Sequence, residues 1–177
     1  TETGDLPPPA TVYVPLGSGG TMAGLVVGFA LAQLSCKVIG VRVVERSMCN
    51  RFVVASLAQR TLEFMRAFDP VFGQTKITLE MIHVEGGYLG EGYGHPTPEG
   101  LEAIRFAKEQ EKLKLEPTYS GKTFAAFMKL APSEKGVPVL FWDTYNSKPI
   151  QSLIKMKVKD LPWKFRRLLE TGEFKPL

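Results

Sequence analysis

Short apolar runs alternate along this chain with longer segments whose apolar residues follow a helical period. Residues 11–16 (TVYVPL) and 37–44 (KVIGVRVV) are rich in β-branched residues and have the length of buried strands. The long apolar segment 21–34 lies between them and predicts a helix. A strand, a helix and a strand in so short a stretch indicate a βαβ unit, and hence a parallel sheet.

The same alternation continues towards the C-terminus. The further expected elements are a helix from an Asn50 N-cap to about Phe68, a strand at 77–84, a helix at 99–111 with Pro98 at its first position, a helix at 121–131, a strand at 137–142, and an amphipathic helix from Pro162 to about Glu170. The helix after Asn50 is expected to place Phe52, Val53, Leu57 and Leu62 on its apolar side. This order predicts an α/β protein, a three-layer αβα sandwich with a mostly parallel sheet.

Composition and charge exclude few classes of protein. The chain has 177 residues, of which 44% are hydrophobic and 23% charged, so it is long and apolar enough to form a buried core. Its net charge of +4 owes much to basic residues between 155 and 167, which we expect to form a solvated face and not a nucleic-acid interface. No apolar run reaches membrane-spanning length, and we expect a cytoplasmic protein without a membrane partner. Cys36 and Cys49 lack metal-ligand spacing, and we expect free thiols and no metal site.

A glycine-rich run connects the first expected strand to the first expected helix. It contains Ser18, Gly19, Gly20 and Thr21. Glycines let a backbone close tightly around an anion, and the unpaired N–H groups of a first helical turn, together with the helix dipole, favour negative charge there. The sequence therefore predicts a phosphate site at this loop.

Other interpretations of the loop remain open at this point. Gly17 and Gly19 match the start of a dinucleotide fingerprint, and Glu45 follows the second strand where a ribose-binding acid would lie, but Met22 stands at the third glycine position. No Gly-Lys-Ser/Thr sequence follows at the distance that a P-loop requires, so the loop is not a P-loop. A tight turn without a ligand is the remaining alternative.

Two later segments each combine a tyrosine with glycine or hydroxyl residues. In the loop at 90–100, Tyr93 lies between two glycines, and a ring on so free a backbone suits contact with a ligand. At 117–122, Tyr119 and Ser120 stand together at the entrance of an expected helix. The simpler alternatives are a core tyrosine in the first segment and a helix N-cap at Ser120 in the second.

Taken together, three motifs resemble a known enzyme family. The segments GSGGTMAGL (17–25), GYLGEGYGHPTPEGLEAIRFA (87–107) and PTYSGKTF (117–124) are similar, in order and spacing, to the pyridoxal-phosphate enzymes that include 1-aminocyclopropane-1-carboxylate (ACC) deaminase and D-cysteine desulfhydrase. The resemblance covers about residues 8 to 130 and implies the tryptophan-synthase-β-like fold. It also implies pyridoxal 5'-phosphate as the cofactor, a small amino acid as the substrate, and a homodimer.

The resemblance also assigns roles to individual residues. It implies that Ser18, Gly19, Gly20 and Thr21 hold the cofactor phosphate, and that Tyr93 and Tyr119 are catalytic. Ser120 corresponds to the residue that faces the pyridine nitrogen, where ACC deaminases carry a glutamate. A hydroxyl there leaves the ring a weaker electron sink, which favours β-elimination from an amino acid such as D-cysteine over opening of a cyclopropane. Residues 143–147 (DTYNS) depart from the histidine-containing loop of the relatives.

The Schiff-base lysine of this family lies upstream of the glycine loop, and no lysine precedes Gly17 here. Lys122 belongs to the C-terminal motif and is not that residue in the family. We therefore expect this chain to be the C-terminal portion of a longer enzyme, to hold half of the cofactor site, and to be inactive alone. The alternative is a non-catalytic domain that binds a phosphate-containing ligand.

Overall fold

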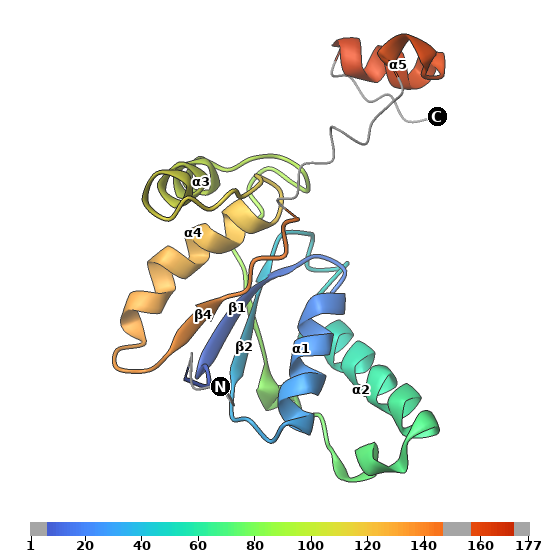
Figure 1. The fold of residues 1–177 in the computed structure, drawn as a ribbon, viewed down its shortest axis with the longest axis vertical. Coiled ribbons are helices and arrows are strands. Elements are labelled where there is room, and N and C mark those ends of the chain that lie inside the picture. Colours follow the sequence, from blue (N-terminus) through green and yellow to red (C-terminus); the bar gives the residue numbers. More distant parts are fainter. Residues whose placement is uncertain (1–6, 147–156, 172–177) are drawn as a thin grey trace. The chain divides into compact units, whose positions relative to one another are not determined.

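The computed structural model describes residues 7–146 and 157–171. Its centre is a parallel sheet of four strands in the order β3-β2-β1-β4 (Figure 1). The strands are β1 (Thr11–Leu16), β2 (Lys37–Arg42), β3 (Ile82–Glu85) and β4 (Val139–Phe141). The parallel sheet confirms the βαβ arrangement that the hydrophobic pattern predicts.

Helices cover both faces of this sheet (Figure 1). Helices α1 (Gly20–Leu31) and α2 (Arg51–Phe68) pack together on one face, and α4 (Ser120–Leu130) packs against β1 and β2 on the other. Helix α3 (Pro98–Gln110) lies against α4. Short 3₁₀ helices occur at Pro70–Gln74, Leu79–Met81 and Ala131–Ser133. The predicted three-layer α/β sandwich is therefore confirmed.

A second compact unit begins at Asn146. Its described part contains a 3₁₀ helix at Val158–Asp160 and helix α5 (Trp163–Thr171). The last predicted helix is thus present and begins one residue after Pro162. No helix among the described residues has the length and apolar character needed to cross a membrane.

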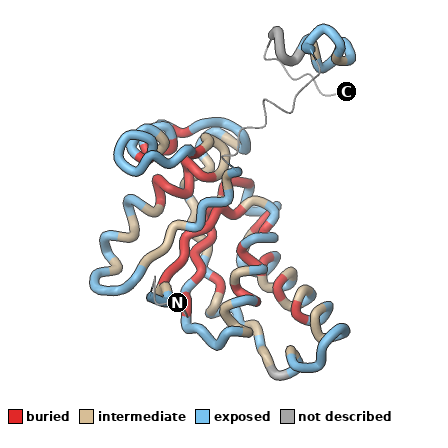
Figure 2. The backbone as a smooth tube through the Cα atoms, in the orientation of Figure 1, coloured by how far each residue is buried: buried red, intermediate tan, exposed pale blue. Residues whose placement is uncertain are grey.

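The core surrounds the two central strands, which Figure 2 shows as the most deeply buried part of the chain. Every residue of β1 is buried, as expected for a central parallel strand covered on both faces. One cluster of buried residues joins the sheet to α1 and α2 and includes Val14, Val38 and Leu62. On the other face, Tyr13, Ile39 and Ala126 form the contact with α4.

The predicted apolar side of α2 is wrong in part. Val54, Ala58 and Leu62 are the buried residues of this helix, spaced four apart along one stripe. Phe52 is 66% exposed and Val53 is 37% exposed, because neither belongs to that stripe, whereas Leu57 is partly buried against the core. Asn50 does cap the helix as predicted, since its Oδ1 accepts hydrogen bonds from the N–H groups of Phe52 (3.0 Å) and Val53 (3.3 Å).

Some element boundaries also differ from the prediction. Helix α1 ends at Leu31 and not at residue 34. The helix stops because Gln33 takes a left-handed backbone conformation (φ 54°), and the N–H of Leu34 donates to the carbonyl of Phe29. Within the strand predicted at 77–84, a 3₁₀ turn at Leu79–Met81 precedes β3. Apolar content alone does not separate such a turn from a strand.

Candidate functional site

The glycine loop lies where β1 ends and α1 begins, at the carboxyl edge of the parallel sheet. Ligands of open α/β sheets bind at this edge. Gly19 occupies the N-cap position of α1 with φ 88°, and no side chain caps the helix. The N–H groups of the first turn therefore have no side-chain partner as a cap and can donate hydrogen bonds to an anion.

Two positions of the loop favour glycine, Gly19 for its backbone conformation and Gly17 for a close approach. Gly19 is in the left-handed region, and an added Cβ would lie 3.4 Å from both the Sγ of Cys49 and a methyl group of Val54. At Gly17, an added Cβ would lie only 3.0 Å from Cε1 of Tyr119. The absence of side chains therefore lets the Tyr119 ring rest against the loop.

A cavity of about 330 Å³ opens at this place. It is lined by Pro15, Gly17, Ser18, Gly19, Gly20, Thr21, Tyr119 and Thr144. The structure thus places the four predicted phosphate-binding residues and Tyr119 around one space. Thr144, from the segment that departs from the family pattern, completes the wall.

Tyr93 and Tyr119 form a pair of phenols. Their hydroxyl oxygens are 2.5 Å apart, and their rings meet edge to face with centroids separated by 5.9 Å. The hydrogen bond to Tyr93, partial burial and the nearby charge of Glu116 raise the pKa of Tyr119 to about 12. Tyr93 is 52% exposed, so one side of the pair is open to solvent. At neutral pH Tyr119 is therefore a neutral phenol that can donate a proton.

Glu116 organises the start of α4, and the sequence analysis missed it. Its carboxylate accepts hydrogen bonds from the N–H groups of Thr118, Tyr119 and Ser120, each at 2.7 Å. A carboxylate at a helix N-terminus satisfies free donors and interacts favourably with the helix dipole. A glutamate three to four residues before the tyrosine and serine was the available signal. This carboxylate fixes the backbone that carries Tyr119.

Ser120 is fully buried, and its hydroxyl is engaged by Glu116. The Oγ accepts from the N–H of Glu116 at 2.8 Å and lies 3.3 Å from both the carbonyl oxygen and Oε1 of that residue. The interpretation of Ser120 as the N-cap is wrong, because Tyr119 holds that position and Ser120 is the first residue of α4. Ser120 does not line the cavity at the glycine loop.

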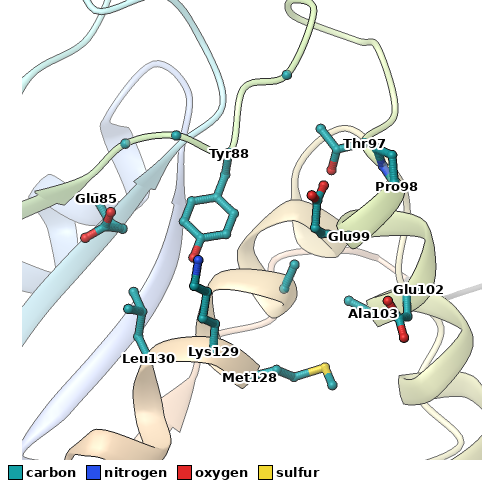
Figure 3. Close-up of a pocket in the computed structure, with 14 residues that line it drawn as sticks. Glu85, Tyr88, Thr97, Pro98, Glu99, Glu102, Ala103, Met128, Lys129 and Leu130 are labelled. Carbon is teal, nitrogen blue, oxygen red and sulfur yellow. The ribbon is translucent and has the colours of Figure 1, made fainter.

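The described structure holds a larger cavity of about 690 Å³ away from these residues (Figure 3). It lies beside Tyr88, with Glu85 and Glu99 on either side of the ring. Burial, followed by the charges of these two carboxylates, raises the pKa of Tyr88. None of the residues predicted for the cofactor or for catalysis lines this cavity.

Comparison with known proteins agrees with the sequence motifs. A family model described as pyridoxal-phosphate dependent enzyme matches residues 1–142. A Pyrococcus furiosus protein with the provisional name 1-aminocyclopropane-1-carboxylate deaminase is 35% identical over 137 residues, which is 76% of this chain and 38% of that protein. A D-cysteine desulfhydrase of Yersinia pestis is 33% identical over 138 residues, 76% of this chain and 39% of the relative.

A solved structure, described as an ACC deaminase homologue, shares the fold. Its TM-score is 0.62 at 26% identity, and the match covers 79% of this chain and 40% of the other. The chain therefore belongs to the family of pyridoxal-phosphate-dependent enzymes. It spans 38% to 39% of the length of the two curated relatives.

The glycine loop fits the cofactor of this family. Pyridoxal phosphate needs an anion site for its phosphate and a flat space for its ring. The first turn of α1 has N–H groups without a side-chain cap, the hydroxyl-bearing residues Ser18 and Thr21 line the same cavity, and the Tyr119 ring lies against Gly17. These donors and this space are suited to a phosphate ester attached to an aromatic ring.

Proposed function

We propose that this chain forms the phosphate-holding part of a pyridoxal-phosphate-dependent lyase or deaminase that acts on a small amino acid. One observation carries the proposal: Tyr119 lines the cavity at the glycine loop and is hydrogen-bonded to Tyr93. This arrangement places an anion site next to a pair of proton donors. Pyridoxal phosphate, when bound, supplies an electron sink for bonds broken at the α-carbon of an amino acid.

In this proposal each residue of the site has a limited role. The first-turn N–H groups of α1 and the hydroxyls of Ser18 and Thr21 hold the phosphate, while Gly19 and Gly20 keep the backbone close to it. Tyr119 orients the ring beside Gly17. Tyr93, on the exposed side of the pair, faces the substrate and exchanges a proton with the hydroxyl of Tyr119.

For the reaction, we favour β-elimination, as in D-cysteine desulfhydrase, over the ring opening of ACC deaminase. At the position where ACC deaminases carry a glutamate, this chain has Ser120, whose hydroxyl is already bonded to Glu116. A neutral group there does not hold a proton on the pyridine nitrogen as a carboxylate does. The resulting weaker electron sink suits loss of a β leaving group.

The complete enzyme, in this proposal, is a cytoplasmic homodimer. Its Schiff-base lysine is a residue other than Lys122, because the Lys122 ammonium is bonded to the carbonyls of Leu89 and Gly92 and does not line the loop cavity. The alternative remains a non-catalytic domain for a phosphate-containing ligand.

Binding by the 177-residue chain tests the phosphate site directly. Titration calorimetry would compare pyridoxal phosphate with pyridoxal, which lacks the phosphate, and with NAD. We expect pyridoxal phosphate to bind at least about tenfold more tightly than pyridoxal, since charge-assisted hydrogen bonds are lost without the phosphate. Ser18→Ala should weaken binding of pyridoxal phosphate, whereas Ser56→Ala, on the exposed surface of α2, should not. Equal affinities for the two pyridoxal compounds would contradict the assignment, and preference for NAD would favour the dinucleotide interpretation.

Product analysis on the complete enzyme tests the reaction. D-cysteine and ACC would be offered separately, and the products identified by mass. Pyruvate, ammonia and sulfide from D-cysteine would support β-elimination. Release of 2-oxobutanoate and ammonia from ACC would show that a serine at position 120 permits ring opening, and no turnover of any small amino acid would favour the non-catalytic alternative. The chain alone should form no keto acid.

A further inference from the structure

We propose that Lys122 is a positioning residue, which holds the loop that carries Tyr93 against α4 and so forms the Tyr93–Tyr119 pair. Lys122 is fully buried although it is a lysine. Its Nζ donates hydrogen bonds to the main-chain carbonyls of Leu89, at 2.7 Å, and Gly92, at 3.4 Å. The second of these carbonyls belongs to the residue immediately before Tyr93.

A buried ammonium group is costly unless hydrogen bonds compensate for the water it has lost. Here burial lowers the pKa of Lys122, and the charge of Glu116 opposes this effect. The two carbonyls of the loop are therefore needed to satisfy the cation, and the cation in turn holds them in place. Such a mutual requirement links α4 to the loop more firmly than an exposed lysine could.

The loop itself has a backbone that needs an external anchor. Gly90, Gly92 and Gly94 all have positive φ angles, of 69°, 154° and 83°. Glycines in these conformations give the chain many alternatives when it is released. Tyr93 lies between two of them and is 52% exposed, so packing of its own side chain does not fix it. Lys122 reaches this loop from α4, the helix whose N-cap is Tyr119, and supplies such an anchor.

That this anchor matters for catalysis rests on the proposed function. The anchoring of the loop by Lys122 rests only on the geometry of the chain. Lys122 touches neither the loop cavity nor the paired hydroxyls. Its effect on Tyr119 passes through the loop and Tyr93. A suitable test therefore observes the phenols and does not depend on bound cofactor.

Carbon-13 NMR of tyrosine labelled at Cζ provides that test. The chain has five tyrosines, which single Phe substitutions would assign. In the wild-type chain, the Tyr119 signal should titrate with a pKa of about 12. In Lys122→Met, the signal should move to the position it takes in Tyr93→Phe, and its pKa should fall towards the ordinary value of 10.0. Adding Tyr93→Phe to Lys122→Met should then change the Tyr119 signal no further.

Lys129→Met is the matched control, because Lys129 lies on the same helix with an exposed side chain. It should leave the Tyr119 signal unchanged. A folded Lys122→Met variant with a wild-type Tyr119 signal would overturn the proposal, even if its melting temperature were lower, because it would show a structural role only.

If Lys122→Met does not fold, a measurement on the unsubstituted chain tests whether Lys122 anchors the loop. With lysine labelled with nitrogen-15 at Nζ, a slowly exchanging ammonium signal with cross-peaks to protons of Leu89 and Gly92 would support the anchor. Absence of such a signal would overturn it. Both results are independent of pyridoxal phosphate, so weak cofactor binding would count against the proposed function and leave the positioning role intact.

Discussion

At the scale of single residues, the most informative contact is the one between two phenol oxygens. Tyr93→Phe removes one partner of the pair, and the hydrogen bond to Tyr93 is the largest cause of the raised pKa of Tyr119. We therefore expect the pKa of Tyr119 to fall from about 12 towards 10.0, so that its Cζ NMR signal begins to shift at a lower pH than in the wild-type chain. Tyr88→Phe, outside the pair, serves as the control and should not change it. An unchanged pKa in Tyr93→Phe would mean that burial, and not the pair, sets the value.

Replacing glycine by alanine should have opposite effects on stability in the glycine loop and within α1. Gly19→Ala should destabilise the chain by about 1–2 kcal/mol, since alanine is strained at a positive φ. Gly24→Ala should stabilise it by up to about 1 kcal/mol, because Gly24 is helical and an added Cβ there has no atom within 4 Å. Urea denaturation of both variants would measure the two free energies of unfolding. Equal effects would contradict the strained conformation assigned to Gly19.

The residues that the sequence did not reveal are those that act through others. Tyr93, Tyr119 and the glycine loop stand out in the chain because their types and spacing are unusual. Glu116 and Lys122 resemble ordinary charged residues until the structure shows a carboxylate accepting three N–H bonds and a fully buried ammonium group. Hydrogen bonds between residues 30 or more apart, such as that of Lys122 to Leu89, leave no local pattern in the sequence.

At the scale of elements, the sequence predicted strands and helices better than the faces they bury. The strand at β1 has the predicted bounds, because a central parallel strand is continuously apolar. The buried side of α2 was predicted only in part, since Leu62 is buried and Leu57 packs against the core, whereas Phe52 and Val53 are exposed. Apolar residues at the end of a helix do not distinguish core from surface, and only the packing of α2 on the sheet does.

The N-cap of α2 allows a test at this scale. Asn50→Ala removes the side-chain acceptor of two N–H groups and should lower the free energy of unfolding by about 1 kcal/mol. Ser56→Ala, exposed within the same helix, should change it by less than about 0.5 kcal/mol. Chemical denaturation followed by circular dichroism would measure both. A loss below about 0.5 kcal/mol in Asn50→Ala, the low limit for such caps, would contradict the capping geometry.

For the molecule as a whole, the shifted pKa values predict a loss of stability in alkali. Burial raises the pKa of Cys36 from 9.0 to about 11, and it also raises the pKa of Cys49 and Tyr13. A group with a raised folded-state pKa stabilises the fold fully below its unfolded pKa and ceases to do so as the pH approaches its folded pKa. Stability should therefore be constant from pH 7 to about 8 and fall from about pH 9 to 11.

Denaturation at several pH values would measure this profile. The variant Cys36→Ala lacks one of the groups, so its stability should fall less steeply between pH 9 and 11 than that of the wild-type chain. Identical slopes would show that Cys36 titrates normally in the folded protein. The buried thiols should also resist alkylation at pH 8, because the thiolate is the reactive form.

The order of the sheet has a practical consequence. Strands β3 and β4 lie at its ends, each paired on one side only among the described strands, and both are short. Unpaired main-chain donors and acceptors can template a strand from another copy, and short edge strands are one way in which proteins limit such pairing. A proline on the open side of β3, which removes a donor from that edge, should therefore leave the concentration dependence of the apparent mass in light scattering unchanged. Any self-association of the 177-residue chain then has to use a surface other than the sheet edges.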